Sequence, residues 1–548
     1  MTRAFPTVLL ALLGGLSLAA ATPPAWFAGA EFLVFAGLAV HFAIATGTMP
    51  TGWRSYLLGC MHMALFSWSV HHVLWFAYAA VVLLGGCYTV LASWATRAAP
   101  TAWRVPAFAL ATAGAYWLRS VMPELHYPHG QPAHCLWQWP GLLGSVSFGG
   151  EALANVLLAG FAGAAVELWR SWRTAELPWR RAWLQIGSLV LLALGTTLGG
   201  RAVHAGLSAD APAAVRLAAI EPGFHPGLEF QGLGEDEFWP RWRAMFLERL
   251  VRPTRELLRG PNPPELVLWP ESSVPDEIEA EPSAGLALRS LAGVFAGHSG
   301  QLLLGGHLVL GDDQLTPAAF LVELPKGEIQ GQQQKRWLVP GGEFPPFLHL
   351  LPAAIGNWLR GTFADVMRHV PNGLAGVELP PLRTSSGVPF GVLLCYDNAF
   401  PGPARSQVQA GARFLCVLSN EAWFRSGDQL VQLVAMTVLR ALETATPVVR
   451  CTQDGWSVVV GADGRVLAEL PRGSGRQPAS RILRTDLPLG AGRESPMAWL
   501  GASLGPATGV SLGLLLLHMA LQWATLRAAR TASRSASTGL SDRRGSGS

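Results

Sequence analysis

The chain has 548 residues, of which 50% are hydrophobic and only 14% are charged, and its formal net charge is +4. A soluble domain carries about 25% charged residues, so this composition excludes an ordinary soluble protein and predicts that much of the chain lies in lipid. The small net charge argues against a nucleic-acid partner. The six cysteines have no CxxC or metal-ligand spacing, which argues against a disulfide framework.

Apolar runs broken by short polar loops fill residues 1–200 and predict a polytopic α-helical membrane domain there. A helix needs about 20 apolar residues to cross a bilayer. On that basis we expect about eight spans, seven of them in this region and one at 499–521, after a long polar region. The predicted spans are 5–21, 26–46, 56–70, 73–94, 105–121, 150–168, 182–199 and 499–521.

The loop arginines favour one orientation in the membrane. If the N-terminus is cytoplasmic, the short loops on the far side, 22–25 and 71–72, contain no Lys or Arg. The segments that this orientation places in the cytoplasm are rich in arginine: Arg54, Arg97, Arg104, Arg170, Arg173, Arg180 and Arg181. Cytoplasmic loops carry such an excess of positive charge. We therefore expect residues 201–498 outside the cytoplasm and both termini inside it.

The two ends of the chain allow further expectations. Residues 1–22 also have the charge, apolar core and small residues of a cleaved signal peptide. We favour a retained first span, because multispan proteins usually keep their first helix. The segment 530–548 is rich in Ser, Gly and Arg, and its low apolar content predicts a disordered cytoplasmic tail.

The hydrophobic pattern of the sequence changes after Pro212, where short β-like runs alternate with amphipathic stretches. We expect helices at 235–258, 283–297 and 427–445. The strand-like runs include "ELVLWPE", "QLLLGGHLVL", "GVPFGVLLC" and "ARFLCVLSN". Alternation of this kind predicts a layered α/β domain, which we assign to residues 213–490.

Three reactive side chains stand at the edges of apolar sequence in this domain. Glu271 ends "LVLWPE", Lys335 lies in "GQQQKRWLVPGGEF", and Cys395 ends "FGVLLC". Binding and catalytic groups gather on loops at such edges. A carboxylate can take the proton of a thiol nucleophile, and an ammonium can stabilise an oxyanion and favour the thiolate. Together the three residues predict acyl-transfer chemistry.

Each of these residues also has a structural interpretation. Glu271 can cap a helix in "PESSVPDE", Lys335 can be a solvated loop charge, and Cys395 can be a small core residue. Cys416 and Cys451 resemble Cys395 in composition, but no acid or base pattern surrounds them. We therefore interpret both as core residues.

Four segments taken together resemble the Glu-Lys-Cys motifs of the carbon–nitrogen hydrolase (nitrilase) superfamily: "WPES", "KRWLVPGGEF", "CYDNAFP" and "SNEAWF". The arrangement of spans, with the last one after the soluble domain, resembles the membrane-embedded branch of that superfamily, the bacterial apolipoprotein N-acyltransferases. The resemblance implies a nitrilase-like αββα sandwich for residues 213–490. It also implies that Glu271 is the general base, Lys335 the oxyanion stabiliser and Cys395 the nucleophile.

The same resemblance suggests supporting residues. Glu343 matches a second glutamate beside the active site, and Tyr396 and Asp397 match an aromatic–acid pair after the nucleophile, although the family usually has Glu at the second position. Trp423 is a candidate for the wall of an acyl channel, with core packing as its alternative. The family pattern has Asp where this chain has Glu421.

The implied reaction moves an acyl chain from a membrane phospholipid, through a Cys thioester, to the α-amino group of the lipid-modified N-terminal Cys of a diacylglyceryl apolipoprotein. It needs no cofactor and no metal. We expect a monomer in the bacterial inner membrane with its catalytic domain on the periplasmic side. A membrane-tethered amidase or hydrolase and a non-enzymatic scaffold are the alternatives.

Two further features received structural interpretations. Arg440 and Glu443 lie three residues apart on a predicted helix, which favours an ion pair. The His-rich segment 126–135 departs from the family pattern. Its irregular spacing favours a polar loop at the membrane surface over a metal site.

Overall fold

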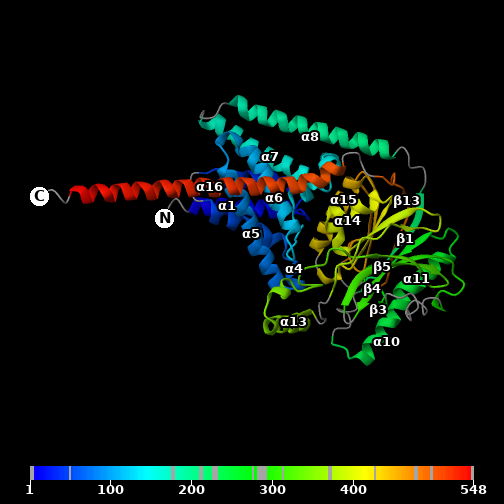
Figure 1. Ribbon diagram of the computed structural model, residues 1–548. Coiled ribbons are helices and arrows are strands. Elements are labelled where there is room, and N and C mark those ends of the chain that lie inside the picture. Colours follow the sequence, from blue (N-terminus) through cyan, green and yellow to red (C-terminus); the bar gives the residue numbers. More distant parts are fainter. Residues whose placement is uncertain are drawn as a thin grey trace.

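The computed structural model describes most of the chain in twelve stretches: 5–47, 51–174, 179–208, 214–224, 232–274, 277–279, 293–311, 314–367, 373–424, 427–473, 479–493 and 498–544. Two domains are evident in Figure 1, a bundle of helices and a sandwich of two sheets. The last helix returns from the sandwich through the bundle and extends beyond it.

Helices occupy all eight positions that the sequence predicts for membrane spans. They are α1 (Phe5–Ala21), α2 (Leu33–Ala45), α3 (Gly52–Phe66), α5 (Trp75–Ala98), α6 (Arg104–Val121), α7 (Val146–Thr174), α8 (Trp179–Ser208) and α16 (Ala498–Arg544). Among the described residues, four of these, α5, α7, α8 and α16, are long and apolar enough to cross a membrane. Helices α1 and α2 are apolar but shorter, so eight full spans go beyond what the helix lengths support.

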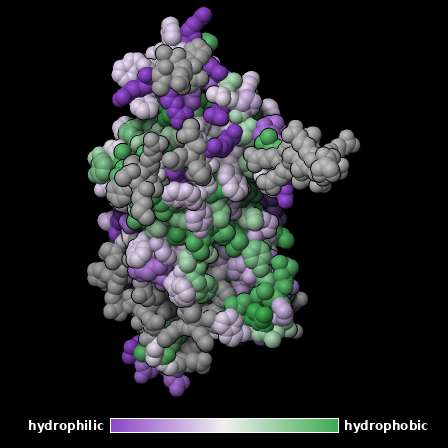
Figure 2. Space-filling view, turned by 90° about the vertical axis from the view of Figure 1, so that its left-hand side faces the viewer, coloured by the Kyte–Doolittle hydropathy of each residue, from purple (hydrophilic) through white to green (hydrophobic). Residues whose placement is uncertain are grey.

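Apolar side chains cover the outside of the helical domain. Leu83 on α5, Leu191 on α8 and Leu514 on α16 are 55%, 72% and 61% exposed. Figure 2 views the molecule from the side of this domain and shows hydrophobic side chains over much of the middle of that face, with hydrophilic ones gathered towards the top. A large exposed apolar surface of this kind marks contact with a membrane.

The strands of the sandwich form two sheets. The first has the order β13-β1-β2-β4-β5-β6, and β3 pairs with β4. The second has the order β12-β11-β10-β9-β8-β7. The strands of the first sheet are β1 (Ala214–Glu221), β2 (Leu266–Leu268), β3 (Glu277–Glu279), β4 (Gly300–Gly311), β5 (Gln314–Leu324), β6 (Glu328–Gln334) and β13 (Arg481–Pro488). Those of the second are β7 (Leu382–Arg383), β8 (Pro389–Leu394), β9 (Leu415–Ser419), β10 (Val448–Thr452), β11 (Val458–Val460) and β12 (Val466–Glu469).

Alternation along the strands builds the layers. Leu217 of β1 joins Leu394 of β8 and Val449 of β10 in the core between the sheets. Its neighbour Ala218 points the other way and joins a second core with Trp242 and other residues of the covering helices. Successive strand side chains point to opposite faces, so each sheet packs on its partner sheet and on helices. The expected αββα layering follows.

The outer helices are α10 (Glu235–Phe246) and α11 (Arg252–Arg259) on the first sheet, and α14 (Pro401–Gln409) and α15 (Gly427–Thr444) on the second. A π-turn at Leu247–Val251 joins α10 to α11, so the predicted helix 235–258 is one helical run with a wide turn. Most of the predicted helix 283–297 lies outside the described residues. The run "VVRCTQDGWSVVV" forms two strands, β10 and β11.

The two domains share a core. Val431 and Val438 of α15 belong to the same apolar cluster as Leu38 of α2, Leu136 of the 122–145 loop and Ala162 of α7. Helix α15 therefore lies between the second sheet and the helical domain. At the other end of the chain, α16 continues to Arg544, so residues 530–544, most of the segment that we expected to be disordered, are helical.

Candidate active site

The three reactive residues each follow a strand. Glu271 comes three residues after β2, Lys335 directly follows β6, and Cys395 directly follows β8. Cys395 has φ +46° and Ser272, next to Glu271, has φ +54°. A left-handed conformation at a residue other than glycine costs on the order of 1–3 kcal/mol and is concentrated at functional sites. Sharp turns at both strand ends thus present the thiol and the carboxylate.

Lys335 joins two carboxylates in what we name the active-site cluster, Glu271, Lys335 and Glu343. Its Nζ lies 3.0 Å from Glu271 Oε1 and 2.6 Å from Glu343 Oε1. Burial alone would lower the pKa of Lys335, but the two carboxylates outweigh it and hold that pKa well above its usual value. The ammonium has three donors, so one N–H remains for another acceptor.

The two carboxylates of this cluster are also held by backbone groups. The N–H of Asn420 donates to Glu271 Oε2 at 3.0 Å, and that of Val339 donates to Glu343 Oε2 at 2.7 Å. Burial, with the nearby Glu271 charge, raises the pKa of Glu343 despite the attraction of Lys335. Each acid is therefore fixed in orientation before any substrate arrives.

Cys395 rests as a thiol. Burial and the Glu271 carboxylate raise its pKa to about 12, while Lys335 and a hydrogen bond from Ser419 act in the opposite direction. The ammonium thus favours the thiolate, as we expected, but its effect is outweighed. A thiol with so high a pKa could act as a nucleophile only if a base beside it takes its proton.

Asp397 faces away from the reacting groups and holds two loops together. Its carboxylate accepts hydrogen bonds from the backbone N–H groups of Arg336 at 3.1 Å, Trp337 at 2.8 Å and Leu394 at 3.3 Å. Burial raises its pKa to about 6 even though these N–H groups lower it. Asp397 therefore fixes the segment after Lys335 against the turn that carries Cys395.

Tyr396 connects this turn to the helical domain. Its hydroxyl donates to the His126 carbonyl at 2.9 Å, and its ring stacks on His129 with centroids 5.9 Å apart. His126 in turn donates from Nε2 to the carbonyl of Leu338 at 2.8 Å. The His-rich loop, expected as a polar surface loop, instead packs against the active site, with His126, His129 and His134 buried.

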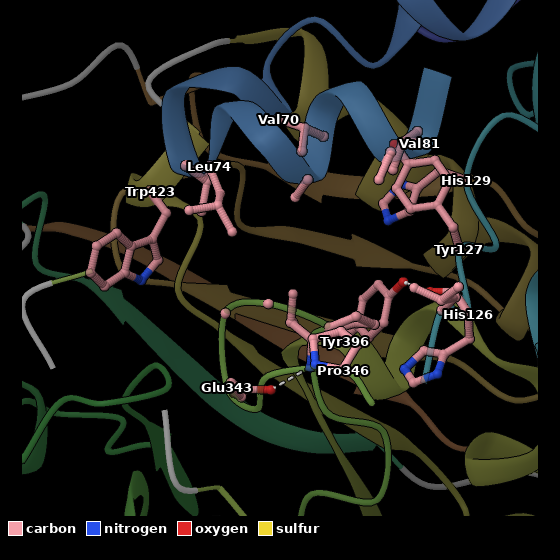
Figure 3. A pocket seen from close by; sticks show the side chains of 18 of the residues that line it. Val70, Leu74, Val81, His126, Tyr127, His129, Glu343, Pro346, Tyr396 and Trp423 are labelled. Carbon is pink, nitrogen blue, oxygen red and sulfur yellow. Dashed lines mark hydrogen bonds between the residues drawn. The ribbon is translucent and has the colours of Figure 1, made fainter. Parts of the chain in front are cut away.

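One cavity of about 630 Å³ contains most of the predicted site. Glu271, Lys335, Glu343, Cys395 and Tyr396 all line it, and so does Trp423. Figure 3 shows Val70 of α4 (Val70–Val73), Leu74 between α4 and α5, and Val81 of α5 on one side, with Glu343 and Tyr396 opposite them. The helical domain therefore supplies one wall of the cavity that holds the thiol.

Two further residues near the sulfur were not predicted from the sequence. Ser419 Oγ donates to Cys395 Sγ at 3.4 Å, and Arg450 donates to Ser419 Oγ at 3.4 Å. A guanidinium has only donors, so the serine oxygen accepts from Arg450 and its one proton remains for the sulfur. Arg450 is fully buried and pairs with the buried Glu421. An arginine inside the apolar run "PVVRC" was the signal for it.

A second buried group of charges lies between the domains. We name Glu151, Arg440 and Glu443 the interdomain cluster. Arg440 forms ion pairs with Glu443, at 2.8 Å between Nε and Oε2, and with Glu151 of α7. The predicted pair of Arg440 and Glu443 is confirmed. Burial raises the pKa of Glu443 to about 7, against the attraction of Arg440.

Comparisons with known proteins bear on this site. Residues 242–493 match the carbon-nitrogen hydrolase family model. The apolipoprotein N-acyltransferase of Caulobacter vibrioides is 29% identical over 521 residues, covering 89% of this chain and 90% of that protein. That of Geobacter metallireducens is 30% identical over 237 residues, covering 42% of this chain and 43% of that protein. The chain thus spans less than half of the Geobacter relative.

An amidase of the nitrilase superfamily from Nesterenkonia AN1 aligns with 50% of this chain and 93% of its own, at 20% identity and a TM-score of 0.33. The family match covers all three residues of the active-site cluster as well as Cys395. Residues 242–493 are therefore similar to a carbon–nitrogen hydrolase domain, in a chain that is similar to the apolipoprotein N-acyltransferase of Caulobacter vibrioides over most of its length.

Proposed function

We propose that the protein transfers an acyl chain from a membrane phospholipid to the N-terminal α-amino group of a diacylglyceryl apolipoprotein. The observation that carries this proposal is the cavity, in which a thiol, an ammonium and two carboxylates face a wall of membrane helices. A water-soluble substrate would need no such wall. Curated relatives named for this activity give independent support.

In the first half-reaction, Cys395 Sγ bonds to an ester carbonyl carbon of the phospholipid, and Glu271 takes the thiol proton. The oxyanion of the tetrahedral intermediate accepts a hydrogen bond from the third N–H of Lys335, the one that does not donate to Glu271 or Glu343. The C–O bond then breaks, the proton on Glu271 goes to the departing oxygen, and a lysophospholipid leaves. A thioester remains on Cys395.

In the second half-reaction, the α-amino nitrogen of the apolipoprotein attacks the thioester carbonyl. Glu271 takes a proton from the amine, the C–S bond breaks, and that proton returns to the sulfur. The products are an N-acylated lipoprotein and the resting thiol. No cofactor or metal enters either step. Glu343 keeps Lys335 in place through its 2.6 Å contact, as a positioning residue.

The arrangement of the chain supports a periplasmic catalytic domain at the inner membrane. Helices α5 and α6 meet at Arg97 and Arg104, and α7 and α8 meet near Arg170 and Arg173. The opposite ends of these helices lead towards the sandwich (Figure 1). Arginine-rich loops remain in the cytoplasm, which puts both termini there and the cavity at the outer leaflet.

The test uses the purified full chain in micelles of phospholipid with isotopically labelled acyl chains. Mass spectrometry of the Cys395 peptide should find a labelled, hydroxylamine-sensitive acyl group, and a diacylglyceryl lipopeptide should remove it and become N-acylated. The Cys395→Ala variant should do neither, whereas Cys416→Ala, at a buried cysteine of the neighbouring strand, should do both.

Two results would contradict the proposal. Absence of a labelled group on Cys395 in the wild-type chain would remove the acyl-enzyme. Release of free fatty acid at the same rate with and without lipopeptide would instead identify a hydrolase.

A further inference from the structure

One face of α5 lines the catalytic cavity for three turns. The cavity residues on this helix from Ala77 onward are Ala77, Ala80, Val81, Leu84, Gly85 and Tyr88, and Phe76 lines the cavity just before them. Their spacing of three and four residues puts them on a single face of a helix. Leu83, which is 55% exposed, lies off that face and is not among the residues that line the cavity. The lining is therefore a continuous stripe.

The two ends of the cavity differ in chemistry. Helix α4 packs against the short helix Ala422–Phe424 of the catalytic domain, while α5 packs against α3, α6 and α16 of the helical domain. The reacting groups therefore lie towards α4 and the start of α5. The stripe on α5 leads away from them into the helical bundle and itself contains no charged side chain, while Arg119 of α6 lines the cavity near Tyr88.

The stripe has the length of one lipid leaflet. Eleven residues separate Ala77 from Tyr88, which corresponds to about 16 Å of helix at 1.5 Å per residue. The hydrocarbon core of a bilayer is about 30 Å thick, so the acyl chains of one leaflet extend over about 15 Å. A single extended membrane acyl chain therefore matches the stripe in polarity and in length.

Side-chain size changes along the stripe. Ala77 and Ala80 lie nearer the catalytic domain and leave room beside the helix, whereas Tyr88 is the largest residue of the stripe and lies at its far end. A chain that runs along the two alanines thus meets an aromatic ring at the end of its path.

We propose that this face of α5 binds the donor acyl chain and that Ala80 and Tyr88 determine which chain length the enzyme accepts. The inference rests on the proposed function, since it concerns the chain that Cys395 takes up. Each methylene of the acyl chain that is buried against the stripe contributes about 0.8 kcal/mol to the binding free energy, or about fourfold in affinity.

The test uses the full chain in detergent with saturated p-nitrophenyl esters of increasing chain length. The sulfur of Cys395 bonds to the ester carbonyl, the C–O bond breaks, p-nitrophenolate leaves, and Glu271 takes the thiol proton. Ala80→Phe should move the preferred ester to shorter chains, with kcat/KM falling about fourfold for each methylene beyond the new limit. Tyr88→Ala should extend acceptance to longer chains. Leu83→Phe, on the same helix but off the stripe, should match wild type.

A second measurement does not depend on turnover. Native mass spectrometry of the Cys395→Ala chain, mixed with fatty acids of graded length, should find shorter bound chains when Ala80→Phe is added and longer ones when Tyr88→Ala is added. Size-exclusion elution and circular dichroism check that each variant is folded.

The inference fails if Ala80→Phe lowers the rate and the binding of all chain lengths by the same factor, or if Leu83→Phe causes the same shift. Failure of the proposed function gives a different pattern. The esters and fatty acids require neither a phospholipid nor a lipoprotein, so the length shifts would persist while lipopeptide acylation is absent.

Discussion

Two buried groups of similar composition stand out in the part of the chain that the structure describes, and only one of them lines the cavity that contains Cys395. The active-site cluster and the interdomain cluster each consist of one cation between two glutamates. Lys335 is 1% exposed and Arg440 is 0% exposed. The residues of the first cluster line the cavity with Cys395, whereas none of the second does. Perturbed charges alone therefore do not mark a candidate active site, and access from the cavity that contains Cys395 distinguishes the two clusters.

The cations suit these different tasks. A lysine ammonium is a compact charge with three donors, so Lys335 can hold two carboxylates and still offer an N–H to substrate. Arg440 presents a planar fork that joins α7 to α15 through Glu151 and Glu443. A buried pair of this kind is expensive to break, because removal of one partner leaves an uncompensated charge.

Of the changes considered, Lys335→Met should have the largest effect on the acylation of Cys395. Loss of a preorganised oxyanion donor costs about 10²–10³-fold in rate, and this substitution also removes the cation between two acids. We expect acylation of Cys395 by labelled phospholipid to fall about 10³-fold or more. Lys326→Met, at a lysine in the β5–β6 turn outside the cavity, is the matched control and should retain wild-type rates. Near-normal acylation in Lys335→Met would remove this residue from the mechanism.

The pH dependence of alkylation tests the resting state of the nucleophile. A pKa raised from 9.0 to about 12 leaves about a thousandfold less thiolate at neutral pH than an ordinary cysteine has. Alkylation of Cys395 by iodoacetamide should therefore rise about tenfold per pH unit up to pH 10 without levelling, because the thiolate is the reacting form. Peptide mass spectrometry separates this site from the other cysteines. A plateau near pH 8 would contradict the thiol assignment.

Arg440→Met should affect stability rather than chemistry. Breaking a buried ion pair from one side costs about 3–5 kcal/mol, so the midpoint of thermal unfolding in detergent should fall strongly. Acylation per folded molecule should stay close to wild type. The triple variant Glu151→Gln, Arg440→Met, Glu443→Gln should recover part of the loss, while Arg252→Met, in an exposed pair with Glu256, should change little. A fall in acylation per folded molecule of Arg440→Met, without a fall in the unfolding midpoint, would show that the interdomain cluster also serves the reaction.

Ser419→Ala should give the smallest effect. The hydrogen bond to the sulfur favours the thiolate, and a bond to a charged group contributes about 1.5–3 kcal/mol. Alkylation of Cys395 below its pKa should slow by about tenfold or more, and acylation by phospholipid should slow with it. Ser419→Thr keeps the hydroxyl and should restore most of both rates. Equal alkylation in the alanine and threonine variants would show that the contact does not matter.

Much of the fold could be predicted because its signals are local. Continuous apolar runs predicted helices at eight positions, and short β-like runs predicted β2, β4, β8 and β9. Strand β6 was missed because "EIQGQQQ" is rich in glutamine, and it pairs only with β5 on one side of the sheet. Strand β13 was missed because Arg481 and Arg484 interrupt its apolar pattern, and its partner β1 lies more than 250 residues away in the chain.

The convergence of Glu271, Lys335 and Glu343 was predictable, since their motifs are short and specific. Their partners were harder, because contacts across distant segments leave no local pattern. Ser419 lies at the end of β9 just as Cys395 follows β8, so the same reasoning about strand ends would have found it. Glu151 had no such signal, because its pairing with Arg440 depends on how two domains pack.

The hydrogen bond from Tyr396 to the carbonyl of His126 ties the sandwich to a loop of the helical domain. Excision of residues 214–493 would leave this hydroxyl without its acceptor and would open one side of the chamber to water. A sandwich exchanged for that of a water-borne amidase would therefore have to supply this contact anew, because a loop of the helical domain touches the residue next to the thiol.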